Sequence, residues 1–230
     1  MAAARILVVA PHPDDEILGV GGTMARAAAA GAEITVLTVA AHMPPLYPEE
    51  VHAQTIAEAK RAHALIGVAK SVFLDIPAMF VNQQPTHELN GRIMEVVTQS
   101  RPQVVLSPFP DRHIDHRIIF DAVMVVTRPV GIGRDIAMVA TYETLSETHW
   151  NAPHIEPNFT ANWVVDISDT IERKIEALEC YESQVLPFPA ARSLEALRAL
   201  AVFRGTQAGF GHGEAMQVVR MTASPESLIG

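Results

Sequence analysis

The stretches RILVVA at residues 5–10 and EITVLTVA at residues 33–40 decide the fold. Each is a continuous run of apolar and β-branched side chains, which is typical of a strand buried on both faces of a parallel sheet. Between them, the Ala-rich segment from Thr23 to Ala30 predicts a helix that stops at Gly31. The first 40 residues therefore predict a β-α-β unit with a right-handed crossover.

The same alternation continues along the chain without a linker or an internal repeat. Further strands are predicted at residues 71–76, 103–107, 137–142 and 162–167, and further helices at residues 48–65, 89–100, 115–127, 169–183 and 193–204. Strands that alternate with helices predict an α/β fold, here a single-domain Rossmann-like three-layer sandwich over residues 1–230 with a mostly parallel sheet. In such sheets, ligands bind at the carboxyl ends of the strands.

Composition excludes several classes of protein. The 230 residues are 49% hydrophobic and 19% charged, as in an ordinary globular protein. The longest apolar runs are far shorter than the roughly 20 residues that cross a bilayer, so no transmembrane segment is expected. A net charge of −9 without a Lys/Arg cluster argues against a nucleic-acid partner.

Two further features bear on location and assembly. The lone Cys180 fits a reducing compartment, and the N-terminus does not look like a signal peptide, so we expect a cytoplasmic protein. The high apolar content is compatible with a homo-oligomer of unknown stoichiometry.

A first polar cluster follows the first strand directly. It reads Pro11-His12-Pro13-Asp14-Asp15-Glu16 and places an imidazole beside three carboxylates. The flanking prolines favour an extended backbone, so a stiff turn presents these side chains. The acidic residues could instead simply begin a helix, where they would complement its dipole, but that interpretation leaves His12 unexplained.

A second polar cluster follows the strand that ends at Ser107. It contains His113-Ile114-Asp115-His116, which taken alone is as typical of an exposed helix start as of a ligand group. Both clusters lie at the same end of a parallel sheet, so we expect them to meet. Three nitrogen and oxygen ligands with an open fourth position suit a catalytic zinc ion, and iron or cobalt would also accept them.

Gly19-Val20-Gly21-Gly22 stands between the first cluster and the Ala-rich helix. It is a poor match to a dinucleotide-binding motif, because Met24 occupies the place of the third glycine. We expect these glycines to let the helix pack close to the sheet.

The chain resembles the PIG-L/LmbE-like family of zinc-dependent N-acetylglucosaminyl deacetylases over almost its whole length. The most specific parts of the resemblance are residues 12–16 and 113–116, and further parts lie at residues 21–23, 166–168, 174–178, 182–184, 204–205, 209 and 214–215. The resemblance implies that His12, Asp15 and His116 bind Zn²⁺, or another divalent metal such as Fe²⁺.

The resemblance also implies how the remaining residues act. Asp14 would be the general base toward a metal-activated water, and His113 would be the protonated partner that stabilises the oxyanion. Either of these two could protonate the leaving amine. Asp115 would orient a neighbouring imidazole, or else be a solvated residue at a helix start.

The substrate implied by the resemblance is a small N-acetylated amino sugar or its conjugate, cleaved at a linear C–N amide bond. His42 and Tyr47 follow the second strand and are candidates for substrate binding, as is Tyr181, for which helix packing is the alternative. Relatives in thiol-cofactor biosynthesis carry an arginine where this chain has Thr55, so the acyl substrate and its aglycone stay open. The rival interpretations are hydrolysis of another amide, such as an N-formyl group, and a non-catalytic sugar-binding protein.

Overall fold

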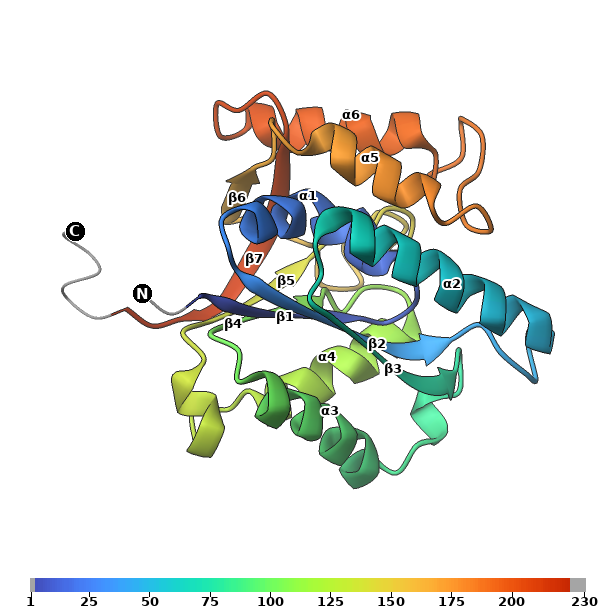
Figure 1. Ribbon diagram of the computed structural model, residues 1–230, viewed down its shortest axis with the longest axis vertical. Helices are drawn as coiled ribbons and strands as arrows, with labels where there is room; N and C mark the ends of the chain where they lie inside the picture. The colour runs from blue at the N-terminus through green and yellow to red at the C-terminus, as the bar shows by residue number, and fades with distance from the viewer. Residues whose placement is uncertain (1–2, 224–230) are drawn as a thin grey trace.

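The computed structural model, which describes residues 3–223, contains a seven-stranded sheet with the strand order β3-β2-β1-β4-β5-β7-β6 (Figure 1). The strands are β1 Arg5–Ala10, β2 Glu33–Ala41, β3 Lys70–Pro77, β4 Val104–Pro108, β5 Met138–Tyr142, β6 Trp163–Asp166 and β7 Gly213–Met221. Strands β1 to β5 pair in parallel, whereas β7 is antiparallel to both β5 and β6. The predicted mostly parallel sheet is confirmed. The strand order reverses between β1 and β4, where such sheets bind ligands.

Helices cover both faces of this sheet. They are α1 Asp15–Ala29, α2 Glu49–Ile66, α3 Thr86–Ser100, α4 Ile114–Val126, α5 Ile171–Glu179 and α6 Leu194–Thr206, with 3₁₀ helices at Val81–Gln83 and Gly131–Asp135. Helices α1, α2, α5 and α6 pack on one face and α3 and α4 on the other (Figure 1). Along β1, Val8 packs into the core beneath α1, α2, α5 and α6, whereas Leu7 and Val9 pack into the core beneath α3 and α4. This alternation is expected of a strand that is buried on both faces. The three-layer α/β sandwich is confirmed.

Helix α1 begins earlier than the sequence predicts. The sequence predicts a helix only from Thr23, but the carbonyl of Asp14 already accepts the backbone N–H groups of Ile17 and Leu18. The glycines lie inside the helix, where a Cβ at Gly19 would overlap the ring of Tyr142 on β5. Their expected role of allowing a close approach to the sheet is therefore confirmed, although the helix boundary was wrong.

A break at Val20 divides α1 into two parts. The backbone of Val20 is not helical, with φ −136° and ψ 22°. The N–H groups of Gly22 and Thr23 donate to the two carboxylate oxygens of Glu214 at 2.8 and 2.6 Å. Glu214 thus satisfies donors at the start of the second part of the helix, as an N-cap would.

The buried ammonium of Lys174 completes this arrangement. Its Nζ lies 2.6 Å from Glu214 Oε1. It also donates, at 2.9 Å, to the carbonyl of Leu18, a residue at the end of the first part of α1. Glu214 lies on β7, a strand that the sequence analysis missed because its neighbours at residues 209–213 are rich in glycine. The ion pair therefore ties α1, α5 and β7 together.

No helix within residues 3–223 combines the length and the apolar character needed to cross a bilayer.

We expect Glu214→Ala to lower the free energy of unfolding by about 3–5 kcal/mol, because it leaves a buried ammonium and two backbone N–H groups without their acceptor. Chemical denaturation measures this change. The control is Glu172→Ala, which removes an exposed ion pair with Arg198 and should leave the transition unchanged within error. Equal transitions for the two variants would contradict the role given to Glu214.

Candidate metal and active site

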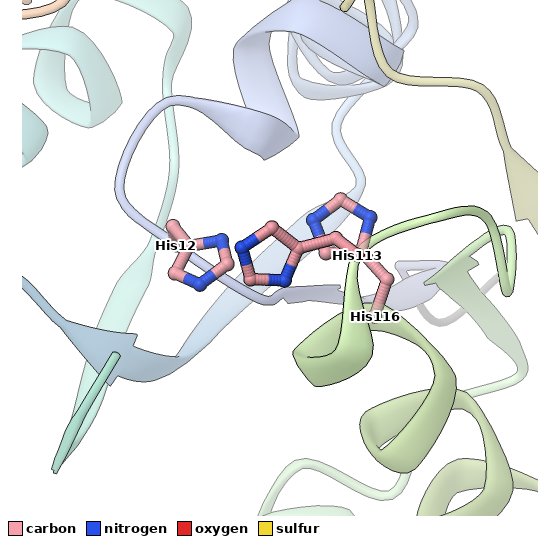
Figure 2. A group of neighbouring side chains, drawn as sticks. All are labelled: His12, His113 and His116. Atoms are coloured by element: carbon pink, nitrogen blue, oxygen red, sulfur yellow. The ribbon is translucent and has the colours of Figure 1, made fainter. Parts of the chain in front are cut away.

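The two polar clusters meet at the carboxyl ends of β1 and β4. Figure 2 shows the rings of His12, from the loop after β1, and of His113 and His116, from the start of α4, gathered around one point. Ring centroids lie 4.6 Å apart for His12 and His113, 5.0 Å for His113 and His116, and 5.6 Å for His12 and His116. One nitrogen of each ring lies within 4.8 Å of the others, so the three histidines could hold a metal ion.

The loop after β1 folds so that the Asp15 carboxylate turns back onto His12. The backbone N–H of His12 donates to Asp15 Oδ2 at 3.0 Å. Between them, Asp14 adopts a left-handed backbone with φ 108°, and its N–H donates to Glu16 Oε2 at 3.3 Å. A non-glycine residue in this conformation is strained, and such strain is commonly found at functional sites.

Two carboxylates fix the tautomers of two imidazoles. Asp115 Oδ2 lies 3.1 Å from His12 Nε2, and Asp111 Oδ2 lies 3.1 Å from His116 Nδ1. We assign the proton to each of these nitrogens, because a carboxylate accepts and does not donate. The remaining nitrogens then direct lone pairs toward Asp15 Oδ2, which lies 3.2 Å from His12 Nδ1 and 3.3 Å from His116 Nε2.

The donor set fits a divalent cation. Two ligand atoms bound tetrahedrally to zinc lie about 3.3 Å apart, which agrees with the separations of Asp15 Oδ2 from the two imidazole nitrogens. Asp15 Oδ1 and His116 Nε2 are buried and have no hydrogen-bond partner among the described residues. Buried acceptors without donors are costly, and a bound cation would satisfy them.

The electrostatics of the pocket also favour positive charge. Burial opposes protonation of His116, but the charge of Asp15 and the hydrogen bond with Asp111 outweigh it and raise the pKa of His116 to about 10, so that a proton takes the Nε2 lone pair unless a metal ion does. In the same way, burial opposes charge on His12, yet the protonated ring can hydrogen-bond both Asp115 and Asp15, and these contacts raise its pKa. The carboxylates thus stabilise positive charge at the point where the imidazole nitrogens converge.

His113 differs from the other two histidines. It is the N-cap of α4, and its Nδ1 accepts the backbone N–H of Asp115 at 3.2 Å. Burial and the neighbouring His12 and His116 lower the pKa of His113 to about 4. The resemblance implies a protonated His113, whereas this environment favours the neutral ring with its proton on Nε2.

Asp14 is fully buried beside this group. Burial raises the pKa of Asp14 to about 7, against the opposing charge of Arg192. The Nη1 atom of Arg192 lies 3.0 Å from Asp14 Oδ2, while Asp14 Oδ1 has no hydrogen-bond partner among residues 3–223. A carboxyl with such a pKa can exchange a proton at neutral pH.

A cavity of about 210 Å³ reaches two of the three histidines and Arg192. It is lined by His12, His42, Tyr47, Ala78, Met79, His113, Glu147, Gln184 and Arg192. The structure therefore brings His42 and Tyr47 to the expected place, with their ring centroids 4.7 Å apart. Tyr181 lies elsewhere: its side chain is fully buried and its hydroxyl donates to Glu16 behind the loop, so it does not reach the cavity.

A second cavity of about 440 Å³ adjoins the first. The two share Glu147, Gln184 and Arg192, and the second is otherwise lined mainly by small and apolar side chains that include Trp150 and Leu186. Trp150 is 60% exposed and Leu186 54% exposed. The site thus continues from a polar pocket into a wider space with an apolar wall.

Sequence reasoning missed several residues of the site. Asp111 lies within the second cluster, where an additional carboxylate close to two histidines was a usable signal. Glu147 and Arg192 come from loops without a periodic pattern, and Arg192 stands 178 positions from its partner Asp14. No local signal could have indicated either of them.

Comparison with known proteins places the chain in a family. The family model for PIG-L, described as GlcNAc-PI de-N-acetylase, matches residues 7–127, which is more than half of the chain. This protein belongs to the PIG-L family. The diacetylchitobiose deacetylase of Thermococcus kodakarensis is 28% identical over 229 residues, covering 94% of this chain and 83% of that protein.

Solved structures share the fold. The N,N′-diacetylchitobiose deacetylase of Pyrococcus horikoshii matches with a TM-score of 0.74 and 23% identity, covering 99% of this chain and 89% of the other. The 4-carboxy-2-hydroxymuconate hydratase of Pseudomonas putida matches with a TM-score of 0.77 and 18% identity, covering 97% of this chain and 98% of the other. The fold alone therefore does not define the reaction.

We expect Asp111→Ala to lower the affinity for Zn²⁺ about 10–100-fold, because His116 then loses the carboxylate that orients its ring. Competition with a chromophoric chelator measures this affinity. Asp121→Ala, which removes an exposed carboxylate on α4, is the control and should bind Zn²⁺ as the unmodified protein does. An unchanged affinity in Asp111→Ala would remove Asp111 from the metal site.

Proposed function

We propose that this protein is a metal-dependent amidohydrolase that removes the acetyl group from an N-acetylated amino sugar or its conjugate. The observation that carries the proposal is that His12 Nδ1 and His116 Nε2 converge on Asp15 Oδ2, at 3.2 and 3.3 Å, beside the buried carboxyl of Asp14. Membership of the PIG-L family and the deacetylase names of the relatives support the same reaction.

In this proposal His12, Asp15 and His116 hold one divalent ion, Zn²⁺ or alternatively Fe²⁺. The ion would lower the pKa of a water molecule and polarise the acyl carbonyl. His113 is left out of the ligand set, although it belongs to the group of three histidines. Its Nδ1 lone pair is engaged by the N–H of Asp115, so its Nε2 carries a proton and offers no lone pair.

The protein's own groups divide the proton transfers between them. Asp14 takes the proton of the attacking water, and its pKa of about 7 lets it hand that proton on to the leaving amine. The neutral His113 donates a hydrogen bond from Nε2 to the acyl oxygen as negative charge develops there. The lowered pKa of His113 supports Asp14 as the donor to the amine. Asp115 orients His12 through the hydrogen bond to its Nε2.

The size of the two cavities supports a conjugate as substrate. The first cavity, about 210 Å³, is smaller than the roughly 300–1,000 Å³ of typical small-molecule sites. We place the acetylated amino group there, beside His42 and Tyr47, and the remainder of the substrate in the adjoining cavity. Another N-acyl group, such as N-formyl, is the alternative for the same chemistry. A cytoplasmic location and homo-oligomerisation stay predictions.

The test of the proposal is release of acetate from a panel of N-acetylated sugars by the Zn²⁺-loaded protein. We expect release that is lost after chelation and restored by Zn²⁺. Asp14→Asn should keep the metal and lower kcat about 10²–10⁴-fold, because the group that accepts the proton is gone.

Asp121→Asn is the matched control and should retain activity, because this residue is exposed on α4. Acetate release by Asp14→Asn within a few fold of the unmodified protein would contradict the role of Asp14. If the zinc-bound protein released formate from the corresponding N-formyl sugars and no acetate from the N-acetyl sugars, the alternative would be favoured.

The metal content of variants distinguishes the proposed ligand set of His12, Asp15 and His116 from a set of three histidines. We expect Asp15→Asn to lose most of its zinc during dialysis, because a charged ligand becomes neutral. His113→Asn should keep about one zinc ion per chain, since asparagine can still cap α4 and no ligand is removed. Elemental analysis measures both. Loss of zinc from His113→Asn together with retention by Asp15→Asn would favour the three-histidine set instead.

A further inference from the structure

We propose that Arg192 is a positioning residue: it holds one oxygen of the Asp14 carboxylate in place and thereby leaves the other free to take the proton of the attacking water. This inference rests on the proposed function. Sequence analysis and the resemblance give no role to Arg192.

The two oxygens of Asp14 have different surroundings. Oδ2 lies 3.0 Å from Nη1 of Arg192, whereas Oδ1 is buried and has no hydrogen-bond partner in the described part of the chain. The backbone of Asp14 is already fixed, because its carbonyl accepts two N–H groups of α1 and its own N–H donates to Glu16. The contact with Arg192 therefore fixes the remaining freedom, the rotation of the carboxylate.

Polar groups from two loops surround the guanidinium of Arg192. Its guanidinium lies 3.4 Å from both Ser146 Oγ and Gln184 Oε1, and 4.0 Å from Glu147. Its carbonyl accepts the N–H of Leu186. The next residue, Ser193, is fully buried and is the N-cap of α6. A side chain anchored by two loops and a helix start can impose an orientation on its partner.

An arginine suits this task better than a lysine. Its planar fork can contact Asp14 through Nη1 while Nε lies toward Ser146, whereas an ammonium is a single point charge on a flexible stem. Of the nine residues that line the first cavity, Arg192 is the one arginine or lysine. No other permanently charged cation in that lining therefore competes with Arg192 for the Asp14 carboxylate.

The test is a double-mutant cycle on the Zn²⁺-loaded protein. We expect Arg192→Ala to lower kcat for acetate release about 100-fold with little change in KM, because a misoriented general base affects the chemical step. Arg192→Lys should recover part of the loss, and guanidinium ion added below denaturing concentration should rescue Arg192→Ala. In the Asp14→Asn background, Arg192→Ala should change kcat by less than about twofold, because Arg192 acts through Asp14.

Arg198→Ala is the matched control, because Arg198 lies on α6, the helix that begins just after Arg192, and pairs with Glu172 on the surface. Zinc content and thermal unfolding of each variant exclude a folding defect as the cause. A raised KM with unchanged kcat would overturn the proposal in favour of substrate binding by Arg192. Full additivity in the cycle, or normal activity of Arg192→Ala beside an inactive Asp14→Asn, would overturn it and leave the proposed function standing. Activity retained by Asp14→Asn, or no acyl release by the unmodified protein, would overturn both.

Discussion

The hydrogen bond from the backbone N–H of His12 to the carboxylate of Asp15 closes the turn on which the rest of the site depends. Because of this turn, Asp15 faces the imidazoles of His12 and His116, and Asp14 is forced into a left-handed backbone that begins α1. The strain at Asp14 persists because its N–H, its carbonyl and its side chain each have a partner. One short loop therefore provides both the candidate metal ligands His12 and Asp15 and the neighbouring carboxyl of Asp14.

Buried charge governs the packing around this loop. Asp14, Asp15, Glu16, Asp111 and Asp115 are all fully buried, and all of them except Asp15 have hydrogen-bond donors from distant parts of the chain. Behind the loop, Glu16 accepts from Tyr181 and lies 3.3 Å from His63 Nε2. Farther back, the Lys174–Glu214 pair satisfies the break in α1. The protein thus tolerates an acidic interior because most of these carboxylates have distant partners. Asp15, which faces His12 and His116 and whose Oδ1 has no hydrogen-bond partner among the described residues, is where a cation is most strongly favoured.

The fold and the chemistry carry separate information about function. The crevice beside β1 and β4 follows from the strand order, and any sheet of this topology has one. A hydratase and a deacetylase share the architecture of this chain, so the reaction has to be argued from the side chains. The chemistry of the site depends on which imidazole nitrogens are free. Asp115 engages one nitrogen of His12, and Asp111 engages one nitrogen of His116. The backbone N–H of Asp115 engages one nitrogen of His113.

The sequence by itself determined the parallel core strands, the helices between them and the two polar clusters, because strand period, apolar runs and proline-framed loops are local properties. Family resemblance added roles for the six residues of those clusters. The early start of α1 and the strand β7 needed the tertiary structure, since Asp14 caps the helix in a strained turn and β7 is defined by pairing with β5 and β6. The distant partners of Asp14 and Asp111 were also hidden, because Arg192, which contacts Asp14, and Thr148, whose hydroxyl donates to Asp111, lie in loops far along the chain. Contacts between distant loops depend on how the whole chain packs, and no local pattern encodes them.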